Sequence, residues 1–202
     1  MSQIVAIFIA SALACLMLLE RSGRADAWDR RILTGIHSGN FNQPRRRSRK
    51  TQRFMYDMTA LAGDTMLMVI IFMALCLCFA TRSIAILPIF LLPVAAARFV
   101  GWGLKKMIRR SRPDFVSDAP RTFTTSFPSV HSLMAMVVFG WLGFILPSLL
   151  GWQNQLPLNI FAATLIFMIG YGRLYLGVHW PSDVIAGWLI GLLILLICSI
   201  LY

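Results

Sequence analysis

The sequence predicts an all-α, polytopic membrane protein with six transmembrane helices. Of its 202 residues, 58% are hydrophobic and only 13% are charged, whereas roughly 25% of the residues of a typical soluble domain are charged. A helix needs about 20 apolar residues to cross a bilayer, and six segments of this chain approach that length. They are residues 4–19, 58–80, 83–104, 132–150, 158–171 and 184–202.

The first segment is short and N-terminal, but we interpret it as a retained span rather than a signal peptide. No cleavage pattern follows it, and residues 20–24 are typical of a helix end. No internal repeat or low-complexity tract divides the chain, which predicts a single domain over residues 1–202. All four cysteines lie in apolar segments, so we expect buried side chains rather than metal ligands. They are Cys15, Cys76, Cys78 and Cys198.

The first long loop, residues 21–57, combines an amphipathic part with a basic part. Helical spacing predicts a short helix in the membrane interface: Trp28, Ile32, Leu33 and Ile36 form its apolar stripe, and Asp29, Arg30 and Arg31 face elsewhere. The basic run at residues 44–50 has two interpretations. It is a solvated or topology-setting charge cluster, or it binds anionic headgroups at about 1 kcal/mol per cation. No nucleic-acid-binding fold accompanies this charge, so no nucleic-acid partner is expected.

Three clusters of polar residues lie at the ends of the apolar segments. With six crossings, the segment ends that carry them fall on the same membrane face, so we expect a site there with residues 105–131 as its main loop. Cations, imidazoles and a carboxylate are the groups needed to attack a phosphate. The clusters are Lys105 with Arg112 and Pro113, the Pro-Ser-Val-His sequence at residues 128–131, and Arg173 with His179 and Asp183.

The first cluster is ambiguous when taken alone. Lys105 and Arg112 are seven residues apart and would share a face of a continuous helix, whose extent Pro113 limits. Arg binds two phosphate oxygens with its planar fork, and Lys acts as a point charge. Snorkelling to the headgroup level explains both cations at least as well, because neighbouring cations have no assigned role. These neighbours are Lys106, Arg109 and Arg110.

The second cluster places a histidine at a helix start. Ser129 can cap the helix, and the free backbone N–H groups of its first turn bind anions. The imidazole of His131 could there protonate a leaving oxygen. A single interfacial histidine is more often structural, so this cluster is also ambiguous in isolation.

The third cluster is the most specific. His179 and Asp183 are four residues apart, and Pro181 suits the first turn of the last helix. If the helix begins there, Asp183 can reach one ring nitrogen of His179 and leave the other free to attack. Arg173 would bind the phosphoryl oxygens. An Asp cap beside an interfacial His would explain neither Arg173 nor the other clusters.

Together these residues resemble the type-2 phosphatidic acid phosphatase family, the membrane lipid phosphate phosphatases. The family motif Lys-x6-Arg-Pro stands at residues 105–113, Pro-Ser-Gly-His at residues 128–131, and Ser-Arg-x5-His-x3-Asp at residues 172–183. The order, the spacing and the positions at span ends all agree. The resemblance implies a six-helix fold over nearly the whole chain.

The resemblance implies a two-step reaction without a metal or other cofactor. His179 would attack phosphorus to give a phosphohistidine, with Asp183 orienting its ring, and His131 would protonate the leaving group. Phosphate-binding groups would stabilise the transition state before water releases phosphate. They are Lys105, Arg112, Ser129 and Arg173.

Two residues depart from the family motifs. Val130 stands where the family has Gly, and its branched side chain disfavours positive φ and close backbone approach. Gly172 replaces Ser and removes one hydroxyl. A third position, Arg98, lies within a predicted span, where it could shape the site from below or pair with a polar group such as Asp64.

The implied substrate is a membrane lipid phosphate or diphosphate, of polyprenyl diphosphate, phosphatidylglycerophosphate, phosphatidate or lipid A type. The sequence does not choose among these headgroups, and it indicates no protein partner or oligomeric state. Two other functions stay open. One is transfer of the phosphoryl group to another acceptor, or hydrolysis of a soluble phosphate ester. The other is a non-catalytic protein that binds anionic lipid, which only Val130 suggests.

The resemblance implies a bacterial cytoplasmic (inner) membrane protein with an outward-facing site. The charge distribution disagrees, because ten of the 19 Lys and Arg residues lie in residues 21–57. The positive-inside rule would place this loop, and the site with it, in the cytoplasm. Phosphate binding accounts for cations of the site loop but not for those of residues 45–53. We favour the outward-facing site.

Overall fold

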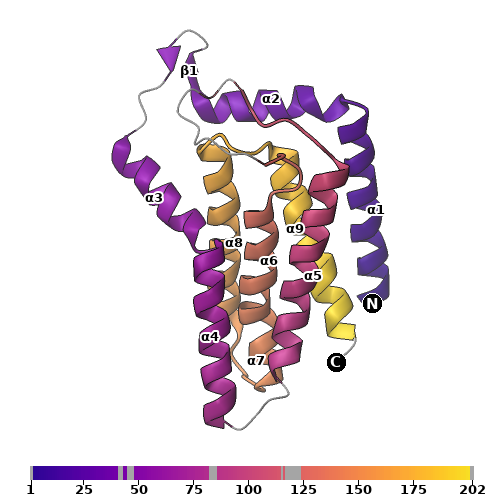
Figure 1. The fold of residues 1–202 in the computed structure, drawn as a ribbon, viewed down its shortest axis with the longest axis vertical. Helices are drawn as coiled ribbons and strands as arrows, with labels where there is room; N and C mark the ends of the chain where they lie inside the picture. The colour runs from indigo at the N-terminus through magenta and orange to yellow at the C-terminus, as the bar shows by residue number, and fades with distance from the viewer. Residues whose placement is uncertain are drawn as a thin grey trace.

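The computed structural model describes residues 2–40, 43–44, 48–81, 86–114, 116 and 124–200. Within these ranges the chain is a bundle of helices (Figure 1), with one short antiparallel pairing of β1 (Ser38–Asn40) and β2 (Gln43–Pro44). Part of the predicted basic run (residues 45–47) and part of the predicted site loop (residues 115 and 117–123) lie outside the described residues.

The helices follow the predicted apolar segments closely, with additional helices in the first long loop. A π-helical turn, η1 (Trp141–Ile145), joins α6 to α7. The helices are α1 (Ser2–Arg21), α2 (Arg24–His37), α3 (Arg49–Ala60), α4 (Asp64–Thr81), α5 (Ile86–Met107), α6 (Val130–Gly140), α7 (Leu146–Leu149), α8 (Leu156–Tyr175) and α9 (Pro181–Ile200).

Several of these helices are suited to cross a membrane, which confirms a multi-pass membrane protein. Four described segments are long and apolar enough: Leu87–Met107, Val130–Ser148, Leu156–Tyr175 and Pro181–Ile200. The bent pair Arg49–Ala60 and Asp64–Met73 gives a fifth if it is counted as one span, and α1 contributes only a shorter apolar stretch. The count of six spans therefore stays a prediction.

The prediction of one continuous helix at residues 58–80 is wrong. The chain turns at residues 61–63, where the N–H groups of Leu61 and Gly63 bond to the carbonyls of Met58 and Ala60, three residues back. The axis bends by 46° at this break. Helix α4 then starts at Asp64, a carboxylate favoured in a first turn by the helix dipole.

Helix α6 lies at the centre of the bundle and packs against α5, α8 and α9 (Figure 1). Two glycines let α9 approach it closely. A Cβ at Gly187 would lie 2.7 Å from the carbonyl oxygen of Ser129, and one at Gly191 would lie 2.8 Å from Cβ of Met136. Small residues permit such close backbone contacts between membrane helices. The contact holds the N-terminal ends of α6 and α9 side by side.

Helix α2 is the amphipathic helix predicted in the first loop, and it lies across one end of the bundle (Figure 1). Its buried residues are Ala25, Asp29 and Leu33, which recur every four residues. The expectation that Asp29 faces away from the apolar stripe is therefore wrong: Asp29 is 0% exposed, whereas Trp28 is 46% exposed.

Candidate active site

The structure brings the three predicted clusters together. The C-terminal ends of α5 and α8 and the N-terminal ends of α6 and α9 lie at the same end of the bundle (Figure 1). A cavity of about 900 Å³ opens among them, and five predicted site residues line it: Lys105, Arg112, His131, Arg173 and His179. The other two, Ser129 and Asp183, are fully buried behind its wall.

Arg112 reaches this cavity by a route that differs from the predicted one. Helix α5 ends at Met107, so Arg112 does not share a helical face with Lys105. The chain leaves the helix after Ile108 and folds back over the site. The shared face considered for a continuous helix is therefore not formed, because Arg112 and Pro113 lie in irregular chain beyond the helix end.

Hydrogen bonds from three of its nitrogens hold the Arg112 guanidinium. Its Nε donates to the Thr124 carbonyl (2.8 Å), Nη2 to the Thr124 hydroxyl (3.0 Å) and Nη1 to the Val178 carbonyl (2.6 Å). Nη1 also lies 3.4 Å from Nε2 of His179. Burial lowers the pKa of Arg112, and the negative charge of Asp183 opposes that change. The cation is thus fixed beside the predicted nucleophile.

Lys105 is tied to the same returning chain. Its Nζ donates to the carbonyl of Thr125 at 2.5 Å, and the Thr125 hydroxyl donates to the Lys105 carbonyl at 3.1 Å. The two cations of the first cluster are therefore held by adjacent residues, Thr124 and Thr125, although neither threonine was identified from the sequence.

Ser129 is the N-cap of α6, as predicted. Its hydroxyl accepts hydrogen bonds from the backbone N–H (3.4 Å) and the hydroxyl (2.9 Å) of Ser132. Its own N–H donates to the backbone carbonyl of Asp183 at 3.0 Å, which joins the starts of α6 and α9. His131 lies in the first turn of α6 and lines the cavity.

The departure at Val130 is accommodated by the helical conformation of its backbone. Val130 begins α6 and so takes a right-handed helical conformation, which a branched residue adopts without positive φ. A Cβ built at Gly101 of α5 would lie 3.6 Å from Cγ2 of Val130. That distance is ordinary van der Waals contact, so the valine packs beside Gly101 without crowding. The helical conformation at Val130 removes the concern about backbone strain.

The departure at Gly172 is explained by the packing of α3 against α8. A Cβ at Gly172 would lie 2.7 Å from Cγ2 of Thr59, and Thr59 is 3% exposed. The space beside Gly172 is thus filled by a methyl group from another helix, so a serine would not fit without a shift of α3.

His179 and Asp183 lie as predicted from their spacing. Nδ1 of His179 is 3.4 Å from Oδ2 of Asp183. Burial lowers the pKa of His179 to about 3, with the charge of Asp183 opposing this effect, so the imidazole is neutral at pH 7. A proton on Nδ1, facing the carboxylate, leaves the Nε2 lone pair directed toward Arg112 and the cavity.

Asp183 has further partners that sequence reasoning missed. Its Oδ2 accepts from the Trp180 backbone N–H (2.8 Å) and from the Ser126 hydroxyl, and its Oδ1 accepts from Nη1 of Arg110 (3.1 Å). Arg110 had no assigned role beside the motif residues. The sequence carries one signal for it, a cation close to Arg112 in a segment that the predicted site already included.

Arg98 both pairs with Asp64 and lines the cavity. Its Nη2 is 2.7 Å from Oδ1 of Asp64, which joins α5 to α4. The two alternatives left open by the sequence are thus compatible, because the pair forms part of the cavity wall below the five site residues. Among the described residues, no group of three or more His, Cys, Asp or Glu side chains could hold a metal ion.

Fold and site together define a helical multi-pass membrane protein with cations and two imidazoles around one cavity at an end of its bundle. The sequence profile of the PAP2 superfamily matches residues 86–202, which include all three clusters. The chain belongs to this superfamily.

Curated relatives share the same part of the chain. Phosphatidylglycerophosphatase B of Bacillus subtilis is 35% identical over 108 residues, which cover 52% of each chain. An undecaprenyl-diphosphatase of Sulfolobus acidocaldarius is 39% identical over 72 residues, 36% of this chain and 31% of the relative. The chain thus spans about half, or less, of the length of these relatives.

Solved structures match the fold over most of the chain. The PAP2-type phosphatidylglycerolphosphate phosphatase of Bacillus subtilis superposes with a TM-score of 0.85 at 24% identity, covering 97% of this chain and 94% of that one. LpxE of Aquifex aeolicus gives 0.62 at 22% identity, covering 85% and 92%. At these identities the similarity shows a shared fold.

Proposed function

We propose that this protein removes phosphate from a membrane lipid phosphate or diphosphate. One observation carries the proposal: the cavity that holds His179, His131 and the three cations also runs along α5 past Ala95, Phe99 and Trp102. Phe99 and Trp102 are 74% and 57% exposed on a helix suited to cross the bilayer. A phosphate site continuous with apolar helix surface suits a ligand that has a charged head and a hydrocarbon tail.

The first step transfers the phosphoryl group to the protein. Nε2 of neutral His179 attacks phosphorus while the bond from phosphorus to the leaving oxygen breaks, and His131 donates a proton to that oxygen. Asp183 keeps the proton of His179 on Nδ1 and stabilises the positive charge that the ring acquires. The product is a phosphohistidine and a dephosphorylated lipid.

The second step returns the protein to its starting state. His131, now without its proton, accepts one from water, whose oxygen attacks phosphorus and breaks the bond to Nε2. Inorganic phosphate leaves. In both steps the charge on the phosphoryl oxygens is stabilised by Lys105, Arg112 and Arg173 and by the start of α6 at Ser129. Such electrostatic stabilisation of the transition state is usually the largest single contribution to the rate enhancement.

Phosphate release from the purified protein in detergent is the first test. We expect hydrolysis of at least one of phosphatidylglycerophosphate, phosphatidate, a polyprenyl diphosphate and a lipid A phosphate, with a kcat/KM above that for soluble phosphate esters.

Activity should persist in excess chelator, because side chains supply the positive charge, and vanadate should inhibit. Loss of activity on chelation that only a divalent ion restores would contradict the mechanism. Phosphate transfer without net release would favour a phosphotransferase, and binding without turnover would favour a lipid-binding protein.

We also propose that the site faces outward from the bacterial cytoplasmic membrane, following the family rather than the cation count. Asp114, exposed beside Pro113 on the site loop, offers a probe. In a variant lacking the native cysteines, Asp114→Cys should react with an impermeant thiol reagent in intact cells. Reaction only after permeabilisation would place the site in the cytoplasm, as the positive-inside rule predicts.

A further inference from the structure

We propose that helix α2 is a positioning element of the active site, in which Asp29 acts through Arg110 to set the orientation of the Asp183 carboxylate. The proposal rests on the proposed function, since it assigns Asp183 the task of orienting His179. It adds a residue that belongs to none of the three clusters and lies 150 positions before His179 in the sequence.

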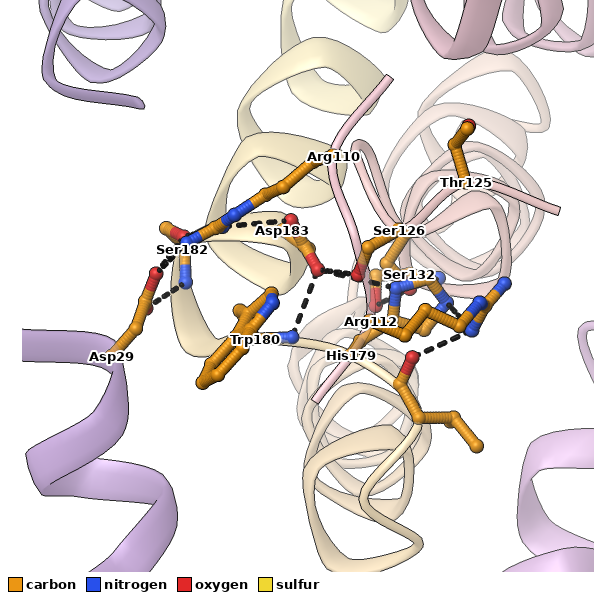
Figure 2. A network of polar contacts seen from close by, with 12 residues as sticks. Asp29, Arg110, Arg112, Thr125, Ser126, Ser132, His179, Trp180, Ser182 and Asp183 are labelled. Atoms are coloured by element: carbon orange, nitrogen blue, oxygen red, sulfur yellow. Dashed lines mark hydrogen bonds and ion pairs between the residues drawn. The ribbon is translucent and has the colours of Figure 1, made fainter. Parts of the chain in front are cut away.

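The carboxylate of Asp29 accepts three hydrogen bonds from other elements of the fold. Its Oδ1 accepts from the Ser182 backbone N–H (2.9 Å), and its Oδ2 accepts from the Ser182 hydroxyl (2.5 Å) and from Nη2 of Arg110 (2.7 Å). Figure 2 shows the carboxylate directed at the first turn of α9. Burial raises the pKa of Asp29, and the Ser182 and Arg110 bonds oppose the rise. A fully buried carboxylate with these partners is not a surface residue of an amphipathic helix.

Arg110 bridges two buried carboxylates. Its Nη2 binds Asp29, and its Nη1 binds Oδ1 of Asp183 at 3.1 Å (Figure 2). The guanidinium is planar and its donors have fixed directions. Asp29, together with the Ser182 hydroxyl that accepts from Nη1 at 2.7 Å, therefore determines where Nη1 can meet Asp183. With Oδ1 held in this way, Oδ2 is left on the side of His179, at 3.4 Å from Nδ1. The bridge therefore holds Oδ1, while the Trp180 N–H and the Ser126 hydroxyl hold Oδ2, and together they set the rotation of the carboxylate that faces the imidazole.

Helix α2 also holds the chain on both sides of His179. At its C-terminal end, Nε2 of His37 lies 2.8 Å from the carbonyl oxygen of Leu174, at the end of α8. Asp29 binds Ser182 at the start of α9. Between these two points, the guanidinium carbons of Arg30 and Arg110 lie 5.7 Å and 5.3 Å from the centroid of the Trp180 ring. The segment that carries His179 is thus fastened to α2 at either end.

A matched pair of variants separates this bridge from an ordinary ion pair. Arg110 Nη2 also binds Asp26 at 2.9 Å, but the Asp26 side chain is 58% exposed and that of Asp29 is 0% exposed. Asp29→Asn keeps the shape and should lower kcat and the rate of phosphohistidine formation about 10–100-fold, the size of effect that small misplacements produce. KM should change little, because Asp29 does not reach the cavity. Asp26→Asn should cost less than about fivefold, as exposed pairs do.

The decisive measurement repeats Asp29→Asn in an Asp183→Asn background. If Asp29 acts through Asp183, the second substitution adds almost no further loss of kcat. A general destabilisation would instead lower activity by the same factor in both backgrounds and would overturn the proposal.

Arg110→Lys provides a second variant should Asp29→Asn fold poorly, since one ammonium cannot bridge both carboxylates in the same geometry. It should show the same loss of kcat and the same dependence on Asp183. An unmodified protein without any phosphatase activity overturns the proposed function as well. An active protein indifferent to Asp29→Asn and Arg110→Lys overturns only the role of α2.

Discussion

His179→Ala should be inactive on every phosphate substrate, whereas His131→Ala should lose activity selectively. Without the imidazole of His179 there is no nucleophile, so no phosphohistidine forms. In the first step, which kcat/KM reports, His131 supplies only a proton, and general acid catalysis typically contributes about 10²–10⁴-fold when the leaving group is poor. A lipid alkoxide is a poor leaving group and an activated phenolate is a good one. His131→Ala should therefore lose far more activity on the lipid phosphate than on an aryl phosphate.

The comparison requires kcat/KM for both variants on both substrates. It also requires detection of the phosphoenzyme, as protein-bound phosphate that acid releases. Circular dichroism and thermal unfolding in detergent show whether each variant is folded. Equal losses for the two histidines on both substrates would leave them in the site but remove the assignment of nucleophile and acid.

Arg112→Lys should lower kcat by about 10²–10³-fold although it keeps the charge, which is the range for removal of one oriented donor to a developing negative charge. The guanidinium binds two carbonyls and a hydroxyl while facing Nε2 of His179 at 3.4 Å. An ammonium has no planar fork and cannot reproduce this set of contacts. The same contacts join the site loop to residue 178, so part of the loss will come from a displaced loop.

Arg109→Lys is the matched control, because Arg109 lies three residues earlier on the same loop and is exposed. It should retain nearly full activity. Phosphoenzyme formation measured in a single turnover separates the chemical step from product release. An Arg112→Lys variant with nearly unchanged single-turnover rate would show that only the positive charge at this position matters.

The parts of the site that could be predicted from the sequence are those with short-range spacing. His179 and Asp183 are one helical turn apart at the start of α9, and Ser129 caps α6 three residues before Ser132. Hydropathy placed the long apolar helices within a few residues of their actual ends. In each case the information lies within a few neighbouring positions, which is where helical periodicity and capping rules apply.

The parts that could not be predicted depend on contacts between distant segments. Whether Arg112 shares a helical face with Lys105 depended on a continuous helix, because periodicity does not reveal that α5 ends at Met107, five residues before Arg112. Asp29 was assigned to the polar face because its partners, Arg110 and Ser182, come from other elements. The close packing of Gly172 against Thr59 is likewise a contact between two helices. No local pattern encodes these pairings.

The glycine contact between α6 and α9 means that activity also depends on packing inside the helix bundle, away from the cavity. His131 belongs to the first turn of α6 and His179 lies two residues before the start of α9, so the separation of the two helix axes sets the separation of the two imidazoles. Side chains elsewhere on α9 that face lipid can be exchanged for other apolar residues with little cost. Gly187 and Gly191, where a Cβ would come within 2.7–2.8 Å of α6 atoms, cannot. We therefore expect inactivating substitutions also at Gly187 and Gly191, which contact α6 rather than the phosphate-binding cavity.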